Sequence, residues 1–248
     1  MRLTQLNEFC RDYLRIDDFK DYCPNGLQVE ACNEVRHVVS GVTASLALIE
    51  AAIEAGADTL IVHHGYFWKG ESACLTGMKG RRVRQLIKNN INLLAFHLPL
   101  DAHPEVGNNV QLARVMDWTT KDSFGEQDIV FEGSIGTPRT LVQFAEDLNL
   151  KLGVSALAIA GGDHPIERIA WCTGAAQDFI EIAAARGVDA FVSGEVSEPT
   201  FHTAREMGIH YLAAGHHATE RYGIQALGEL IATRFDVTHQ FIDIPNPV

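Results

Sequence analysis

Apolar segments of helical and strand type alternate along almost the whole chain, and this alternation is the feature that most limits the fold. Residues 1–16 carry apolar side chains at helical spacing, and 35–41 form a short apolar run typical of a strand. Further strands are expected over 59–62, 91–96, 155–160, 168–172, 190–193, 209–214 and 238–242, with helices over 45–55, 80–89, 108–116, 137–148, 176–186, 199–207 and 218–235. Such alternation predicts an α/β protein with mainly parallel strands.

The two halves of the sequence repeat each other weakly. EAGADTLIVHHG (54–65) parallels ARGVDAFVSGEV (185–196), and NINLLAFHLPLD (90–101) parallels GIHYLAAGHHAT (208–219), in the same order. Residues 117–136 are polar and contain glycine, which suits a connection. We therefore expect two similar α/β lobes, about 1–125 and 126–248, that face a central metal-binding cleft.

Composition excludes several classes of protein. The 248 residues are 46% hydrophobic and 21% charged, which rules out a disordered or fibrous chain. The net charge of −12 argues against a protein that mainly binds nucleic acid backbones. Lys79, Arg81, Arg82 and Arg84 form a local basic patch that leaves nucleic acid contact open, although a solvated helix face is the favoured interpretation. No segment predicts a membrane span or a secretory signal. The five scattered cysteines form no CxxC pair, which favours reduced thiols in the cytoplasm.

Ionisable side chains follow the predicted strands at four places. Ligands of parallel α/β sheets bind beyond the carboxyl ends of the strands, so these positions are candidates for a site. His63 and His64 end one strand, and His97 and Asp101 follow the next. In the second half, Glu195 follows one strand, and His216, His217 and Glu220 follow another.

These residue types at these places indicate metal binding. His216 and Glu220 are four residues apart at the start of a helix and therefore share a face. With His63, His64 and Asp101 they make three imidazoles and two carboxylates, more than one ordinary zinc site uses, and they suit two bridged ions. The same mixed ligands admit zinc, manganese, iron, cobalt or nickel. Taken singly, a histidine at a strand end is more often a hydrogen-bonded structural residue than a metal ligand.

Catalytic roles are predicted for Glu220, His97 and Glu195. We expect Glu220 to bridge the two ions, and His97 or Glu195 to transfer protons; a salt-bridged glutamate at the rim is the alternative for Glu195. Tyr66-Phe67-Trp68-Lys69 offers rings for a planar base and a cation for a phosphate, or packs as an ordinary loop. The P-loop, dinucleotide, GxSxG and HExxH motifs do not occur.

Long motifs in this sequence resemble the YbgI-type branch of the Nif-three-like family, whose members are called homologues of type 2 GTP cyclohydrolase 1. They are GVTAS (41–45), IVHHGYFWKGE (61–71), HLPLDAHPEVGNN (97–109), GEVSE (194–198), AAGHHATERYG (213–223) and FIDIPNP (241–247). The resemblance covers essentially the whole chain. It implies a dinuclear metal site with His63, His64, Asp101, His216 and Glu220 as ligands, and a toroidal homohexamer. It also implies a link to nucleotide handling after radiation damage.

Three functions are compatible with these features of the sequence. The leading one is a cytoplasmic, metal-dependent hydrolase of a nucleotide or another small heterocycle. The second is a non-catalytic, ring-shaped metal-binding or adaptor protein, linked to the response to DNA damage. The third is metal storage or delivery.

Overall fold

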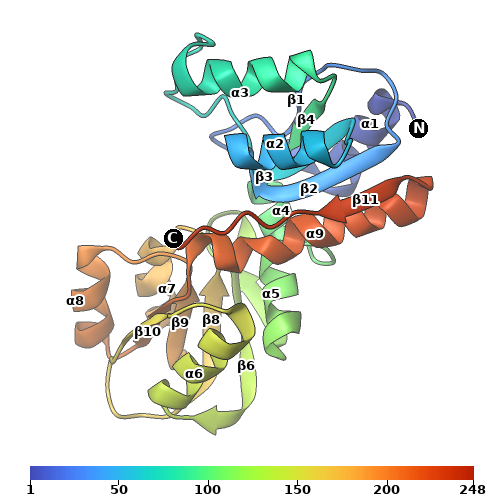
Figure 1. Cartoon of the computed structure of the whole chain (residues 1–248). Coiled ribbons are helices and arrows are strands. Elements are labelled where there is room, and N and C mark those ends of the chain that lie inside the picture. Colours follow the sequence, from blue (N-terminus) through green and yellow to red (C-terminus); the bar gives the residue numbers. More distant parts are fainter. The chain divides into compact units, whose positions relative to one another are not determined.

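The computed structural model describes all 248 residues and divides into two compact units (Figure 1). The first unit comprises Met1–Gly107 and Gly223–Pro245, and the second comprises Asn108–Tyr222 and Asn246–Val248. The break at Gly107 comes earlier than the expected boundary near residue 125. The reason is that Leu112, Ala113 and Met116 of α5 (Asn108–Met116) are buried in the core of the second unit. The second break, at Tyr222, falls within α9 (His216–Phe235).

The first unit is built on a five-stranded sheet in the order β1-β4-β3-β2-β11. Its strands are β1 (Gly26–Val29), β2 (His37–Thr43), β3 (Thr59–His64), β4 (Asn92–Ala95) and β11 (Thr238–Phe241). All neighbours are parallel except β1, which runs antiparallel to β4 at one edge. Its helices are α1 (Leu3–Tyr13), α2 (Leu46–Glu54), α3 (Gly77–Lys88) and α4 (Leu98–Ala102).

Both faces of this sheet are covered, which explains why its central strand is a continuous apolar run. Successive side chains of a strand point to opposite faces. Leu60 and Val62 of β3 accordingly pack in a cluster with α2 and α3, whereas Ile61 packs in a second cluster with α1 and α9. The strand is therefore fixed from both sides, and so is the position of the histidines at its end.

The second unit holds a six-stranded mixed sheet in the order β5-β6-β8-β9-β10-β7. Parallel pairing joins β8 to β9 and β9 to β10, and the other three pairs are antiparallel. The strands are β5 (Thr119–Phe124), β6 (Val130–Arg139), β7 (Leu157–Ile159), β8 (Ile166–Cys172), β9 (Ala190–Ser193) and β10 (His210–Ala213). The remaining helices are α6 (Leu141–Leu152), α7 (Ile180–Ala185) and α8 (Glu198–Met207).

The polar stretch 117–136 is not the connection that its composition suggested. It contains β5 and the first part of β6, which pair with each other. The side chains of β5 are mostly exposed because the strand lies at the edge of its sheet, so the apolar alternation that announces a strand is missing there. Sequence periodicity therefore found β7, β8, β9 and β10 of this unit but missed β5 and β6.

The internal repeat is visible in the order of elements. The first unit runs α1-β1-β2-α2-β3-α3-β4, and the second runs α6-β7-β8-α7-β9-α8-β10. In each, the short strand after the first helix pairs antiparallel with the last strand of the series. The α/β class and the repeated architecture are thus confirmed, with the second sheet more mixed than expected.

Two local features concern α2 and α3. Ser45 caps α2, since its Oγ accepts a hydrogen bond from the backbone of Leu48 at 3.2 Å. The proposed basic patch loses Lys79, which is buried and bonds the Ser72 carbonyl and the Glu71 carboxylate. None of the helices combines the length and apolar character needed to cross a bilayer.

Candidate metal centre

The first group of candidate ligands lies at the carboxyl ends of β3 and β4 in the first unit. These strands are parallel neighbours with Val62 opposite Ala95, so the residues that follow them meet at one edge of the sheet. One ring nitrogen each from His63, His64 and His97 lies within 4.8 Å of the others. The sequence prediction that these strand ends converge is therefore confirmed within this unit.

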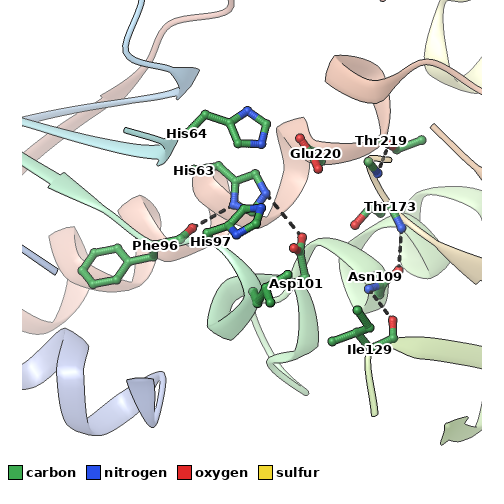
Figure 2. A network of polar contacts seen from close by, with 12 residues as sticks. His63, His64, Phe96, His97, Asp101, Asn109, Ile129, Thr173, Thr219 and Glu220 are labelled. Atoms are coloured by element: carbon green, nitrogen blue, oxygen red, sulfur yellow. Dashed lines mark hydrogen bonds and ion pairs between the residues drawn. The ribbon is translucent and has the colours of Figure 1, made fainter. Parts of the chain in front are cut away.

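The orientation of His63 is set by a backbone group. Its Nδ1 lies 2.8 Å from the carbonyl oxygen of Phe96, and Figure 2 shows this bond. A carbonyl oxygen can only accept, so Nδ1 of the neutral ring carries the proton and Nε2 keeps its lone pair. Nε2 lies 3.5 Å from Oδ1 of Asp101 on α4, and both side chains are buried. In this tautomer Nε2 is the atom that can bind a metal.

His97 is oriented by Asp21, a residue that the sequence analysis did not single out. The Nδ1 atom of His97 lies 2.9 Å from Oδ1 of Asp21. Asp21 also accepts hydrogen bonds from the Leu98 amide and the Asn25 side chain. Burial would raise the pKa of Asp21, but the His97 bond and charge and these donors outweigh it and lower the pKa to about 2. The carboxylate is therefore charged and holds His97 through Nδ1.

Cys23 lies close to Asp21 and His97, and by distance alone these three could also hold an ion. Burial raises the pKa of its thiol, and the negative charge of Asp21 raises it further. The thiol donates a hydrogen bond to Oδ1 of Asp21 at 3.7 Å. Asp21 and Cys23 are better described as the support of His97.

The second group lies at the carboxyl ends of β9 and β10 in the second unit. Those strands are parallel, with Ser193 opposite Ala213, and Glu195 and His216 follow them. His216 Nδ1 lies 2.6 Å from Oε1 of Glu195, and its Nε2 lies 3.1 Å from Oε2 of Glu220. Glu220 is 2% exposed. The predicted i, i+4 pair at the start of α9 is therefore present, and Glu195 is joined to it.

Two carboxylates make His216 an unusually strong base. Burial lowers the pKa of the ring, but hydrogen bonds and charge from Glu220 and Glu195 outweigh burial and raise the pKa to about 9. A proton on His216 would offset only one of the two carboxylate charges. A divalent cation would offset both, since it binds imidazole nitrogen and carboxylate oxygen.

Glycine is required beside Glu220. Gly174 has φ +69°, and a Cβ at this position would lie 2.1 Å from Oε1 of Glu220 and 3.3 Å from Nε2 of His216. The Gly174 amide donates to Oγ1 of Thr219 at 3.1 Å, which ties the loop after β8 to the first turn of α9. The glycine thus leaves room for the carboxylate at the place where a side chain would fill it.

Asn109 also holds the loop after β8 in place. Its Nδ2 donates to the Ile129 carbonyl at 3.1 Å, and its Oδ1 accepts from the Thr173 amide at 3.0 Å, as Figure 2 shows. Asn109 is fully buried. Gly174, Thr219 and Asn109 were all absent from the predicted site, because nothing in their spacing distinguishes them from ordinary turn and helix residues.

Other histidines and aromatic residues have ordinary structural roles. His103 bonds the Tyr13 carbonyl at 3.0 Å, and His239 bonds Ser40 at 2.8 Å. Neither belongs to the predicted ligand set. Of the aromatic run after the histidine pair, Tyr66 is buried with its hydroxyl on the Ala44 carbonyl, whereas Trp68 remains partly exposed.

The residues present fit divalent cations. His63 and His216 repeat one arrangement: each is held through Nδ1 by an acceptor, and each has Nε2 beside a buried carboxylate. Metal-binding histidines in proteins are held in this way. Nitrogen and carboxylate oxygen together suit zinc and the neighbouring transition metals rather than calcium or magnesium.

Two α/β units of repeated topology, each with imidazole and carboxylate groups at its strand ends, define the class as an α/β protein with candidate metal ligands. The family model described as Duf34/NIF3 (NGG1p interacting factor 3) matches residues 1–247, and the chain belongs to this family. This confirms the resemblance that the sequence motifs indicated.

Relatives and solved structures agree along the full length. A Pseudomonas aeruginosa protein named GTP cyclohydrolase 1 type 2 homolog is 55% identical over 248 residues, covering 99% of this chain and 98% of that protein. A Vibrio cholerae protein of the same name is 53% identical, with both chains fully covered. The solved structure of protein ybgI, described as of unknown function, superposes with a TM-score of 0.97 at 48% identity and full coverage of both chains. That of TTHA1606 from Thermus thermophilus gives 0.91 at 35% identity, again with full coverage.

Proposed function

We propose that this chain is a metal-dependent hydrolase of a nucleotide or related small heterocycle, with two divalent cations held by His63, His64, Asp101, His216 and Glu220. The observation that carries the proposal is the repeated arrangement of His63 and His216. A structural histidine needs only one satisfied nitrogen. A buried carboxylate beside Nε2, present in both units, favours a cation.

The chain's own residues have distinct parts in this proposal. Bound divalent cations supply positive charge that lowers the pKa of water and polarises the bond to be hydrolysed. His97, with Nδ1 held by Asp21, is the candidate that takes a proton from water at Nε2 and returns it to the leaving group. Glu195 bonds His216 through Oε1, which favours orientation of this ring over the proton transfer suggested by the sequence.

The substrate class has separate support. Relatives that cover the whole chain are named GTP cyclohydrolase 1 type 2 homolog, which supports a nucleotide or related heterocycle. A cytoplasmic location and the ring-shaped homohexamer belong to the same proposal. The mass of the assembly in solution tests the hexamer.

Metal content and turnover test the function together. We expect two transition-metal ions per chain, measured by elemental analysis of gently purified protein. His63→Ala and Glu220→Ala each lower this number, and turnover in a screen of nucleotides and phosphoesters falls with it. The chain offers a matched control: His202 and Glu198 are an exposed i, i+4 pair 3.1 Å apart, and His202→Ala leaves both measurements unchanged.

Two outcomes would contradict the proposal. Full metal content in the double variant His63→Ala/Glu220→Ala would show that these residues do not hold the ions. Two bound ions without turnover of any compound in the screen would favour the alternative of a non-catalytic metal-binding or adaptor protein.

A further inference from the structure

Two aromatic side chains of the first unit, Tyr22 and Trp68, lie beside the candidate ligands without belonging to them. Their ring centroids are 5.7 Å apart, and the Trp68 ring is 5.0 Å from His97 and 6.0 Å from His64. Tyr22 is 5.0 Å from His97. Tyr22 is also 53% exposed.

Hydrogen bonds hold the Trp68 ring and the backbone of Tyr22. The Tyr22 amide donates to Oδ1 of Asp21 at 2.7 Å, and its carbonyl accepts from the Lys69 amide at 2.7 Å. The indole Nε1 of Trp68 donates to the Gly65 carbonyl at 3.2 Å. These bonds fix the two segments to each other and the indole next to His97 without a ligand. A surface ordered in advance loses little entropy when it binds.

Packing does not account for these two rings as it does for their neighbours. Tyr66 is 4% exposed and bonds a backbone carbonyl, and Phe67 packs on the apolar core under Lys79. Trp68 is the one ring of the run 66–68 that is neither in the core nor packed on it. Tyr22 meets it from a distant part of the sequence. The two together form an aromatic surface at the edge of the histidine group.

We propose that the Tyr22–Trp68 surface binds a planar heteroaromatic ring of nucleobase size by stacking, and so presents the substrate to the histidine group. This proposal specifies the substrate class of the proposed function and rests on that function, because the surface lies beside His64 and His97. A ring inserted between two others needs about 7 Å between their planes. The 5.7 Å between centroids leaves no such gap, so the ligand stacks on the exposed side of the surface.

Tryptophan fluorescence makes the surface observable. The chain has three tryptophans, and the other two, Trp118 and Trp171, are 8% and 0% exposed in the core of the second unit. Stacking on Trp68 therefore quenches the only accessible indole. With metal-loaded full-length protein, we expect guanosine and adenosine to quench the emission and ribose 5-phosphate to leave it unchanged. Trp68→Phe removes the signal, and Trp118→Phe keeps it.

Affinity measured by equilibrium dialysis of guanosine separates the effect of the rings from other effects. Loss of one stacking ring is expected to weaken binding by about tenfold or more. Tyr22→Leu and Trp68→Leu should show this loss, whereas Tyr22→Phe and Trp68→Phe, which keep a ring, should bind within about twofold of the parent. Metal content measured on the same samples should stay at the parent value in all four variants.

The inference is overturned if the parent protein does not bind guanosine or adenosine, or if it binds ribose 5-phosphate as well as either nucleoside. It is also overturned if both leucine variants bind like the parent, or if they lose their metal, because the rings would then be structural supports of the histidines. If guanosine or adenosine binds and both leucine variants lose affinity, but the protein turns over no compound, the stacking surface is supported and only the hydrolase function is contradicted.

Discussion

His216 and Glu220 lie one helical turn apart, with Nε2 of the imidazole 3.1 Å from Oε2 of the carboxylate. The pair depends on a residue outside its own helix: Gly174, whose missing side chain makes room for the carboxylate. The i, i+4 spacing of His216 and Glu220 brings their side chains together, and Gly174, distant in the sequence, leaves room for the carboxylate.

Gly174→Ala is expected to displace Glu220. The added methyl group would lie 2.1 Å from Oε1, and the left-handed backbone costs about 1 kcal/mol more for alanine. We expect metal content to fall by at least half and the free energy of unfolding to drop. Gly208→Ala is the matched control, because Gly208 has the same φ of +69° and nothing within 4 Å of a Cβ. Equal metal loss in both variants would contradict the steric argument.

Glu195→Ala removes the acceptor that holds His216 through Nδ1. Loss of such a partner typically weakens metal binding about 10- to 100-fold. Competition with a chelator of known affinity measures the change. Glu198→Ala, which removes the partner of the exposed His202, should leave the affinity unaltered. An unchanged affinity in Glu195→Ala would mean that the proton on Nδ1 needs no acceptor.

Asp21→Asn tests the support of His97 through pH. The pKa of Asp21 is lowered from 3.8 to about 2 in the folded protein, so the carboxylate stabilises the fold above about pH 4 and loses this contribution as pH falls to about 2. We expect the variant to be less stable than the parent by about 1–2 kcal/mol at neutral pH, with a difference that shrinks through this acid range. Urea unfolding at several pH values measures it. A difference that does not change with pH would show that charge is not the cause.

Asn109→Ala should destabilise the second unit without touching a candidate ligand. It leaves the Ile129 carbonyl and the Thr173 amide without their bonds to Asn109 in a buried site, a loss of about 2–4 kcal/mol. Chemical denaturation measures the loss. Asn149→Ala, at a half-exposed residue that bonds the Ala156 amide, should cost less.

The sequence predicted the fold where burial imposes a period. Parallel strands that are covered on both faces, such as β3, stand out as apolar runs, and the ligands at their ends follow from topology. The edge strand β5 was not predicted, because its side chains are mostly exposed and show no alternation of apolar and polar residues. The role of Asp21 was not predicted for another reason: Asp21 lies 76 residues from His97 in the sequence, and only folding brings the two side chains together. Residues that hold ligands in place are revealed by contact, not by spacing.

His63 and His216 differ in what holds them. The partner of His216 is the side chain of Glu195, which a single codon change replaces. The partner of His63 is the main-chain oxygen of Phe96, which every amino acid carries. Natural variation can therefore tune the basicity of one imidazole freely, whereas that of the other is insulated from mutation at residue 96 so long as the backbone keeps its path.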